Sequence, residues 1–567
     1  MLRTFCQHHV RPSRSLDGCW SFVPDCERTD NGALPKKYTR ETLVPSAWEI
    51  LPGLETFRGQ GWMRRRFWCS GERPVRLVFG GVVHTVSVFI DGKKVGKHYD
   101  GFVPWDLVVT GLSAGEHELV LEIDNTFGKH SALHVRGDHY SSGGITRPAE
   151  LQEVPAVFID KIFATPKLAR GKWSLDVRVR LRNVGRKALE RRVVVSVAGQ
   201  TLDLGSATVA GKSTHELTGR VTKLKVKPWS AEKPKLYEIK AELCDGDDVV
   251  DDLIDRVGFR QITIKGAQLL LNGEPIRLRG YNRHEFHGHF GQSLPVEVMA
   301  GDVQMLKDLG CNFIRTSHYP NDMRMLDLAD EMGLYIWEET NSTSVGFKHP
   351  KYTEQITACA ESMVGWHFNH PSIVIWATLN ECDAKTKSGR KEHGRMLQLL
   401  RDLDGSRPVT YASCAWKEDA CLDLPDIISW NWYEGWYWGS IASIQEGIDT
   451  FLAWQDRASK GKGKPVIISE FGAGAFYGYR APTRIKWTEQ YQADALDELL
   501  RVYLNHPRIM GTAIWQFNDV RISHEQDWGP RPRCINNKGT VDEFRRRKLA
   551  YESVKKRMHE ARKRFGR

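Results

Sequence analysis

From about residue 264 onward, short apolar runs alternate with amphipathic stretches, and this alternation restricts the possible folds most strongly. Two of the amphipathic stretches, Met299 to Leu309 and Met323 to Glu331, have the apolar spacing of helices. Eight runs have the length and composition of buried strands, and they begin near Ile276, Phe313, Leu334, Ile373, Val409, Ile427, Val466 and Gly511. Eight strands separated by helices predict a (β/α)8 TIM barrel over residues 264–567.

The residues before the barrel alternate between apolar and polar positions in the manner of strands. Val83 to Ile90 runs into the turn pair Asp91-Gly92, and His117 to Ile123 ends at another turn pair. We expect residues 1–155 to form a β-sandwich.

Strand patterns continue in the next hundred residues. Trp173 to Leu181 alternates, and shorter runs follow at Arg192 to Val195 and Tyr237 to Ala241. Several short strands in a segment of this length predict an immunoglobulin-like sandwich over residues 156–263.

The composition is that of a globular protein, with 41% hydrophobic and 27% charged residues in 567. No apolar stretch reaches the ~20 residues that span a bilayer, so no membrane partner is expected. Met1 to His9 lacks the apolar core of a signal peptide, and the 11 cysteines form no CxxC pairs. We therefore expect reduced thiols and a cytoplasmic location, with export open only if a leader sequence has been removed.

Lysine and arginine outnumber the acidic residues by 81 to 70, which gives a formal charge of +11. The basic clusters Arg545 to Lys548 and Lys555 to Arg557 raise the question of nucleic-acid binding. Aromatic residues do not interleave with these charges as base stacking requires, so we expect a solvated face of the last helix and no nucleic-acid partner.

Two glutamates stand where apolar strand patterns end. Ser372 to Glu381 is a short β-branched run that ends in Asn380-Glu381, and Pro465 to Gly472 repeats the pattern with Glu470. Active sites of TIM barrels lie at the carboxyl ends of the strands. Two carboxyl groups there can cleave a glycosidic bond, one as nucleophile and one as proton donor. The alternative is structural, in which a glutamate only pairs with a barrel arginine such as Arg315.

Two long segments resemble the signatures of glycoside hydrolase family 2. They are Asn312 to Pro320, with Asp327 to Glu338 behind it, and Asn369 to Glu381. The order of the three predicted domains, and Arg256 to Arg260 before the barrel, are also similar to that family. The resemblance implies that the first sandwich is jelly-roll-like and similar to sugar-binding domains. The resemblance implies Glu381 as acid/base, Glu470 as nucleophile, hydrolysis with retention of configuration, and no cofactor.

Three further parts of the chain resemble the β-glucuronidases of this family most. Asn536-Asn537-Lys538-Gly539, after Arg533, resembles the motif whose Asn and Lys bind the sugar carboxylate. Asn431 to Tyr437 and Asp138 also match glucuronidase positions. The resemblance implies Asn431, Tyr433, Tyr437, Arg533, Asn536, Lys538 and Asp138 as substrate-binding residues, and an exo-acting β-glucuronidase cleaving small-molecule or oligosaccharide glucuronides. Family members are commonly dimers or tetramers, so a homo-oligomer is expected.

Other features leave alternatives open. Arg279 to Glu285 reads like the galactosidase version of the first barrel strand, and the loop between Arg533 and Asn536 is one residue shorter than in typical glucuronidases. Asn536 to Gly539 could also be a plain turn. The alternatives are a β-galactosidase, a β-galacturonidase, or a non-catalytic carbohydrate-binding scaffold.

We expect the remaining candidate residues to lie around Glu381 and Glu470. Asn380 is a partner for the sugar 2-hydroxyl, His318 a hydrogen-bonding wall residue, and Trp515 a stacking platform. His287 and His289 are close enough in sequence to chelate a metal. We expect no metal site there, because such histidines more often form hydrogen bonds.

Overall fold

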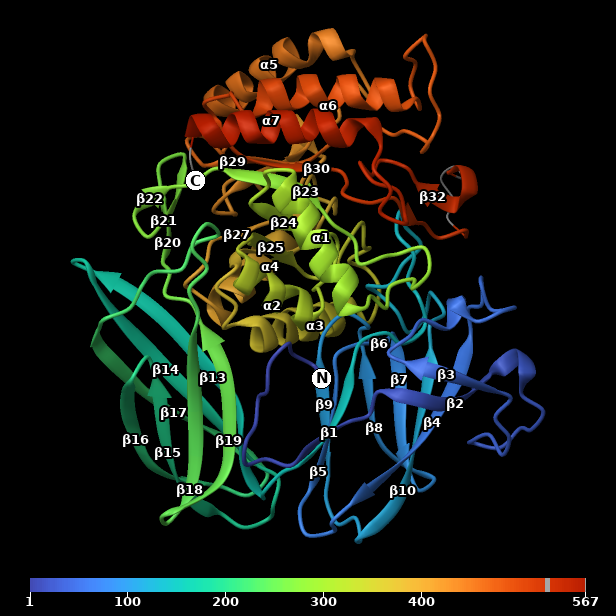
Figure 1. The fold of residues 1–567 in the computed structure, drawn as a ribbon, viewed down its shortest axis with the longest axis vertical. Coiled ribbons are helices and arrows are strands. Elements are labelled where there is room, and N and C mark those ends of the chain that lie inside the picture. Colours follow the sequence, from blue (N-terminus) through green and yellow to red (C-terminus); the bar gives the residue numbers. More distant parts are fainter. Residues whose placement is uncertain (526–530, 566–567) are drawn as a thin grey trace.

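The computed structural model describes residues 1–525 and 531–565. Two antiparallel sheets at the amino-terminal end, blue in Figure 1, pack face to face around Trp20, Phe22 and Leu121. The six-stranded sheet contains, in spatial order, β3 (Arg40–Val44), β2 (Gly18–Pro24), β4 (Gln60–Cys69), β10 (Gly115–Asp124), β7 (Thr85–Ile90) and β8 (Lys93–Tyr99). The four-stranded sheet contains β1 (Ser13–Ser15), β12 (Ala149–Glu153), β5 (Val75–Phe79) and β9 (Trp105–Val109).

A second sandwich follows, drawn in teal and green (Figure 1). Its sheets are β13 (Val157–Ala169), β14 (Lys172–Asn183) and β17 (Ser213–Leu224), and β16 (Gln200–Val209), β15 (Leu189–Val197), β18 (Tyr237–Asp245) and β19 (Asp248–Val257). In β14 every second side chain is buried, which is the alternation that the sequence predicts for a strand with one face on a core.

Eight parallel strands form the barrel. They are β23 (Leu278–Asn282), β24 (Phe313–Arg315), β25 (Tyr335–Glu339), β26 (Ile373–Ala377), β27 (Val409–Thr410), β28 (Ile428–Asn431), β29 (Val466–Phe471) and β30 (Ile509–Ile514). A bridge between Ser413 and Trp430 joins the ends of β27 and β28, so the sheet comes nearly full circle. Each strand begins within two residues of its predicted position, and the predicted fold class is confirmed.

Seven α-helices are found in the described part of the chain, and all belong to the barrel region. They are α1 (Val296–Asp308), α2 (Met323–Met332), α3 (Tyr352–His367), α4 (Lys387–Leu403), α5 (Ile444–Ala458), α6 (Glu489–Tyr503) and α7 (Leu549–Phe565). Helices α2 and α3 face the first sandwich. Asp327 of α2 forms an ion pair with Arg3, and the side-chain oxygen of Gln355 in α3 accepts the backbone N–H of Ala132. None of the described helices is long and apolar enough to cross a bilayer.

A small sheet covers the end of the barrel where the strands begin. It consists of β20 (Ile262–Lys265), β21 (Gln268–Leu271) and β22 (Glu274–Pro275). Leu269 and Leu271 pack in one cluster with Phe313 and Trp337 of the barrel interior. The opposite end of the barrel, where the strands finish, carries polar side chains.

The sequence predicted that the basic cluster Arg545 to Lys548 lies on the last helix, and this prediction was wrong. Helix α7 begins at Leu549, so the cluster is in the loop before it. Arg545 pairs with Asp302, and the fully buried ammonium of Lys548 donates to Asp519 at 2.8 Å. These two cations therefore stabilise the barrel end and do not form a solvated face.

Candidate active site

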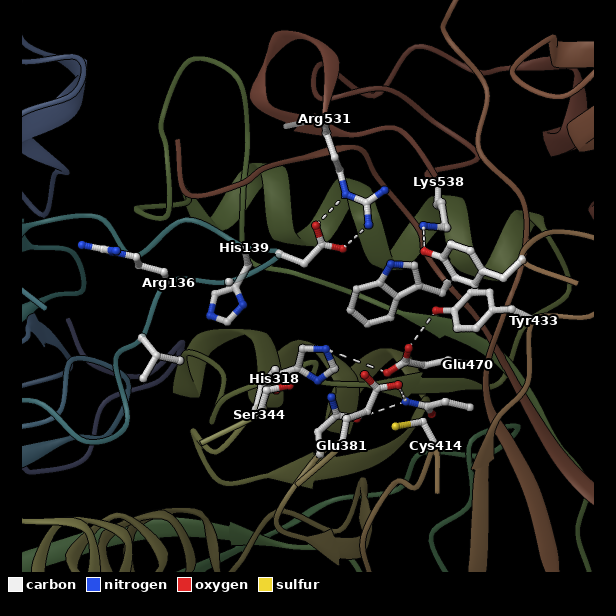
Figure 2. Close-up of a pocket in the computed structure, with 18 of the residues that line it drawn as sticks. Arg136, His139, His318, Ser344, Glu381, Cys414, Tyr433, Glu470, Arg531 and Lys538 are labelled. Atoms are coloured by element: carbon white, nitrogen blue, oxygen red, sulfur yellow. Dashed lines mark hydrogen bonds and ion pairs between the residues drawn. The ribbon is translucent and has the colours of Figure 1, made fainter. Parts of the chain in front are cut away.

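A cavity of ≈ 330 Å³ opens at the carboxyl ends of the barrel strands (Figure 2). Barrel residues form most of its wall, and a loop of the first sandwich, between β10 and β11 (Gly144–Ile145), supplies the rest. Of the predicted site residues, the lining includes Glu381, Glu470, Asp138, His318, Asn380, Asn431, Tyr433, Tyr437, Trp515 and Lys538. The two glutamates thus face one cavity.

Glu381 follows β26 in a turn that departs from ordinary backbone geometry. Leu379 and Glu381 have φ of 58° and 48°, in the left-handed region, which is costly for residues other than glycine. Asn431 Nδ2 donates to Glu381 Oε1 at 2.8 Å and holds the carboxyl group over the cavity. Burial, and then the negative charge of Glu470, raise the pKa of Glu381 to about 7. A carboxyl group with this pKa can give a proton at neutral pH.

Glu470 lies on β29 with a donor on each oxygen. Arg315 Nη1 donates to Oε1 at 2.8 Å, and the Tyr433 hydroxyl donates to Oε2 at 2.7 Å. Burial raises the pKa of the Glu470 carboxyl, while Arg315 and Tyr433 act against this rise by bonding the ionised form. Glu470 is therefore paired with Arg315, as the structural alternative in the sequence analysis expected. Its carboxyl group nevertheless faces the cavity.

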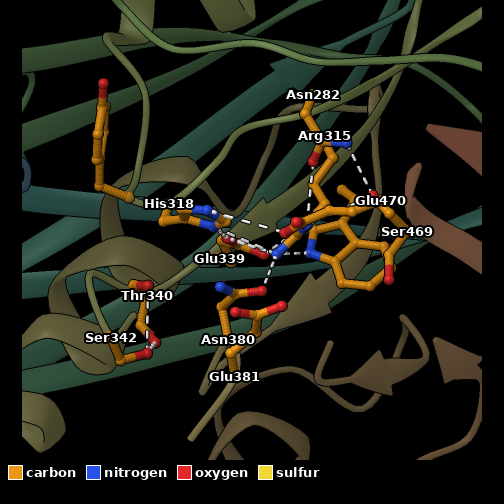
Figure 3. Close-up of polar contacts among 12 residues, drawn as sticks. Asn282, Arg315, His318, Glu339, Thr340, Ser342, Asn380, Glu381, Ser469 and Glu470 are labelled. Atoms are coloured by element: carbon orange, nitrogen blue, oxygen red, sulfur yellow. Dashed lines mark hydrogen bonds and ion pairs between the residues drawn. The ribbon is translucent and has the colours of Figure 1, made fainter. Parts of the chain in front are cut away.

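Arg315 connects Glu470 to a buried ionic network (Figure 3). Its Nε donates to Glu339 Oε2 at 2.9 Å, and its Nη2 donates to Asn380 Oδ1 at 2.7 Å. Because β24, β25, β26 and β29 each contribute or precede one member, the guanidinium fixes the relative positions of four strand ends.

His318 and Trp515 form a flat aromatic wall. Their rings stack with centroids 4.9 Å apart at 18°. Burial, and then Arg315, lower the pKa of His318 well below its usual value, so the ring is neutral. His318 Nδ1 lies 2.8 Å from Glu339 Oε1, and because a carboxylate accepts, the proton belongs on Nδ1. The other ring nitrogen is then an acceptor.

The opposite part of the cavity is basic. Lys538 is 1% exposed, and its Nζ donates to the Tyr437 hydroxyl at 2.9 Å. The same Nζ lies 5.8 Å from the ring centroid of Tyr433. Although burial acts to raise it, Lys538 and Arg531 hold the pKa of Tyr437 below its usual value. A buried ammonium among neutral rings is a ready partner for an anionic group of a ligand.

Arg531 is a second cation here that the sequence did not single out. It forms a two-point ion pair with Asp138, with Nε to Oδ1 and Nη2 to Oδ2 both at 2.6 Å. Asn536 Nδ2 donates to Asp138 Oδ2 at 2.7 Å. Asp138 and Arg531 line the cavity, whereas the fully buried Asn536 supports Asp138 from outside the lining.

Arg533 does not reach the cavity, contrary to its predicted role. Its side chain is 61% exposed and forms an ion pair with Glu543. The backbone explains this orientation, because Arg533 and Cys534 both have positive φ (61° and 50°) and turn the chain between Arg531 and Asn536. His139, Cys414 and Trp416 are further lining residues that sequence reasoning missed.

A barrel whose strand ends bring the partly buried Glu381 and the buried Glu470 to one cavity, with the pKa of Glu381 near neutrality, has the equipment of a glycoside hydrolase. Comparison with known families agrees. The model described as the TIM barrel domain of glycosyl hydrolases family 2 matches residues 262–562, and a second family 2 model matches residues 157–260. The protein belongs to glycosyl hydrolases family 2 and is a glycoside hydrolase.

Relatives within the family act on different sugars. The chain is 27% identical to a β-glucuronidase of Streptococcus agalactiae over 91% of both chains. It is 32% identical to a β-galactosidase of Streptococcus thermophilus over 81% of this chain and 46% of that protein. A crystal structure of a β-galacturonidase from Eisenbergiella tayi, bound to galacturonate, superposes with a TM-score of 0.93 at 39% identity and covers 99% of both chains. The prediction of a family 2 enzyme resembling β-glucuronidases is confirmed.

Proposed function

We propose that this glycoside hydrolase is a retaining, exo-acting β-uronidase, which releases a uronic acid from the non-reducing end of its substrate. One observation carries the proposal: the buried Lys538 ammonium faces the same cavity as Glu381 and Glu470. A neutral sugar gives this buried charge no anionic partner, whereas a C6 carboxylate does.

The chemistry proceeds by double displacement. Glu470 attacks the anomeric carbon while Glu381 gives its proton to the leaving oxygen, so the glycosidic bond breaks as a glycosyl ester forms on Glu470. Glu381, now ionised, takes a proton from water, and the water oxygen displaces Glu470 from the same face that the leaving group left. The pKa of about 7 at Glu381 and the two donors on Glu470 support these roles.

The other lining residues orient the sugar in this proposal. Lys538 and Tyr437 bind the C6 carboxylate. Arg531 lies beside them and forms an ion pair with Asp138. Asn380 holds the 2-hydroxyl, and Trp515 lies under the ring. Asn536 is a positioning residue, because it contacts Asp138 and does not line the cavity.

Galacturonic acid and glucuronic acid differ in configuration at C4 and share the C6 carboxylate. The 39% identity to a β-galacturonidase over nearly the whole chain favours β-D-galacturonides as the preferred substrates. The galactosidase-like segment Arg279 to Glu285 favours them as well. The β-D-glucuronides expected from Asn431 to Tyr437 are the second candidates, since glucuronidases of similar length are also relatives.

A panel of nitrophenyl β-glycosides with the purified protein tests the proposal. We expect kcat/KM for the galacturonide and the glucuronide to exceed that for the galactoside by at least about a hundredfold, the order expected of one buried charge contact. Replacing Lys538 with Met should remove most of that advantage and leave the galactoside rate nearly unchanged. Faster hydrolysis of the galactoside than of both uronides by the unaltered protein would refute uronide recognition.

Several sequence predictions lie outside what this site addresses. The domain limits 1–155, 156–263 and 264–567, a dimeric or tetrameric state and a cytoplasmic location stay predictions. The rival hypothesis of a non-catalytic scaffold predicts no hydrolysis of any glycoside in the panel.

A further inference from the structure

Two tryptophans line the active-site cavity without any part in the proposed hydrolysis. They are Trp416, which follows barrel strand β27, and Trp438, in the loop after β28. Trp416 is 37% exposed, whereas Trp515, the platform proposed for the terminal sugar, is 3% exposed. Trp416 therefore offers an accessible indole surface in the wall of the cavity.

The indole of Trp416 is held in place by its surroundings. Its Nε1 donates to the Asn431 carbonyl at 3.3 Å. Its ring meets those of Trp438 and Trp432 edge to face, with centroids 4.8 Å and 5.9 Å away. The φ of Trp416 is 49°, in the left-handed region that is costly for a bulky side chain. A strained backbone that presents an accessible aromatic ring to a cavity points to a role in binding.

Trp416 lies on the side of the cavity where the proton donor is. Asn431, whose carbonyl accepts the Trp416 N–H, donates its side-chain N–H to Glu381 Oε1 at 2.8 Å. The backbone N–H of Glu381 donates to the carbonyl of Ala412, four residues before Trp416. Because the leaving oxygen takes its proton from Glu381, the group attached to that oxygen extends past Glu381. Trp416 is placed to meet this group.

The two lining indoles form a corner with apolar faces. The planes of Trp416 and Trp438 cross at 69°, and Trp432 packs against both of them. Indole faces stack on flat groups that present C–H bonds, which include an aromatic ring and the apolar face of a pyranose. A small acyclic group would leave most of this surface in water.

Resting on the proposed function, we propose that Trp416 and Trp438 bind the leaving group, and that this group carries a six-membered ring that stacks on the indoles. The ring belongs to an aromatic alcohol or to a second sugar. A ring held there keeps the scissile oxygen at Glu381 while the first bond breaks. The later hydrolysis of the glycosyl ester does not depend on the two indoles, because the leaving group has then departed.

The test compares three β-uronides of the same terminal sugar, whose leaving groups are methanol, 2-phenylethanol and the 6-hydroxyl of a neutral hexose. All three leaving oxygens need protonation by Glu381, so the differences in kcat/KM report mainly on binding of the leaving group. We expect kcat/KM to exceed that of the methyl uronide by about tenfold for at least one of the other two. The substrate that shows this advantage identifies the kind of ring.

Trp416→Ala should remove most of the advantage and change kcat/KM for the methyl uronide less than about threefold. Trp416→Phe keeps a flat ring but loses the N–H that bonds Asn431, and it should retain most of the advantage. Trp432→Phe is the matched control, because Trp432 packs in the same cluster and is not among the described residues that line the cavity. It should leave the advantage unchanged.

The proposal would be overturned if the unaltered protein showed no advantage over the methyl uronide. It would also be overturned if Trp416→Ala lowered kcat/KM equally for all three substrates, because Trp416 would then act only through Asn431. A failure of the proposed function is distinguishable, since none of the three uronides, the methyl uronide included, would then be hydrolysed.

Discussion

Arg315 donates to Glu470 through Nη1 at 2.8 Å while its Nε and Nη2 both bond Glu339. One buried guanidinium thus favours the ionised form of the proposed nucleophile against the effect of burial and points the carboxyl group into the cavity. A lysine could supply the positive charge, but it lacks the planar set of N–H donors with which the guanidinium holds Glu470 and Glu339 together.

Arg315→Lys is therefore expected to lower kcat on a nitrophenyl uronide by about a hundredfold, because Glu470 loses its fixed orientation. Steady-state kinetics and the melting temperature should be measured together. Arg283→Lys is the control, since Arg283 is equally buried and pairs with Asp302 away from the cavity. It should lower the melting temperature with little effect on kcat, and equal losses of kcat in both variants would contradict this role for Arg315.

The pKa of about 7 at Glu381 predicts how the rate depends on pH. A proton donor must be protonated in the free enzyme, and its protonated fraction falls as the pH rises through its pKa. We expect kcat/KM for a nitrophenyl uronide to decline above about pH 7. A dinitrophenyl uronide needs little protonation of its leaving group, so its decline should be much weaker. The same decline with both substrates would assign the titration to another group.

The same shift predicts an effect on stability. The ordinary value is 4.5, so the folded state holds the Glu381 proton more tightly than the unfolded chain does, and stability is lost as the pH rises from about 4.5 to about 7. The loss is on the order of 3 kcal/mol at most. Glu381→Gln keeps an acceptor for Asn431 and should raise the melting temperature at pH 8 by a few degrees. The gain should shrink towards zero at pH 5, and a gain that does not depend on pH would exclude this cause.

Arg531 and Arg533 give a direct test of how the loop after the barrel is folded. Arg531→Gln should raise KM for a uronide about tenfold, because Asp138 and the carboxylate-binding end of the cavity lose a charge. Arg533→Gln should change neither KM nor kcat, since Arg533 pairs with Glu543 at the surface. The opposite result would place the wrong arginine at the cavity.

Sequence patterns predicted the barrel well because its strands are short, apolar and bounded by polar residues at the same end. The run that ends at Glu381 and the run that ends at Glu470 both occupy strands where they were expected. Lys538 also lines the cavity, as its motif predicted. Local patterns suffice for the two glutamates because the direction of a barrel strand determines at which end of the barrel it finishes, whereas Lys538 was found through the family resemblance of its motif.

Positions that depend on irregular backbone were not predictable in this way. Arg531 and Arg533 are two residues apart, and the chain turns between them and Asn536 through the positive φ of Arg533 and Cys534, which the sequence does not reveal. Asn536 turns towards Asp138, a residue of another domain nearly 400 positions earlier. A cavity of ≈ 1020 Å³ between the loop that contains Phe127 to Arg136 and the loop Val345 to His349 has no sequence signal either, because its walls come from two separate parts of the chain.

The central claim is that Glu470 forms a covalent bond to the sugar while Glu381 transfers the proton. A 2-fluoro-β-uronosyl fluoride should inactivate the protein by accumulating the glycosyl ester, and mass spectrometry of the digested protein locates the label. We expect one label per chain on the peptide that contains Glu470, and none after Glu470→Gln. A label on another residue, or inactivation that persists in Glu470→Gln, would contradict it.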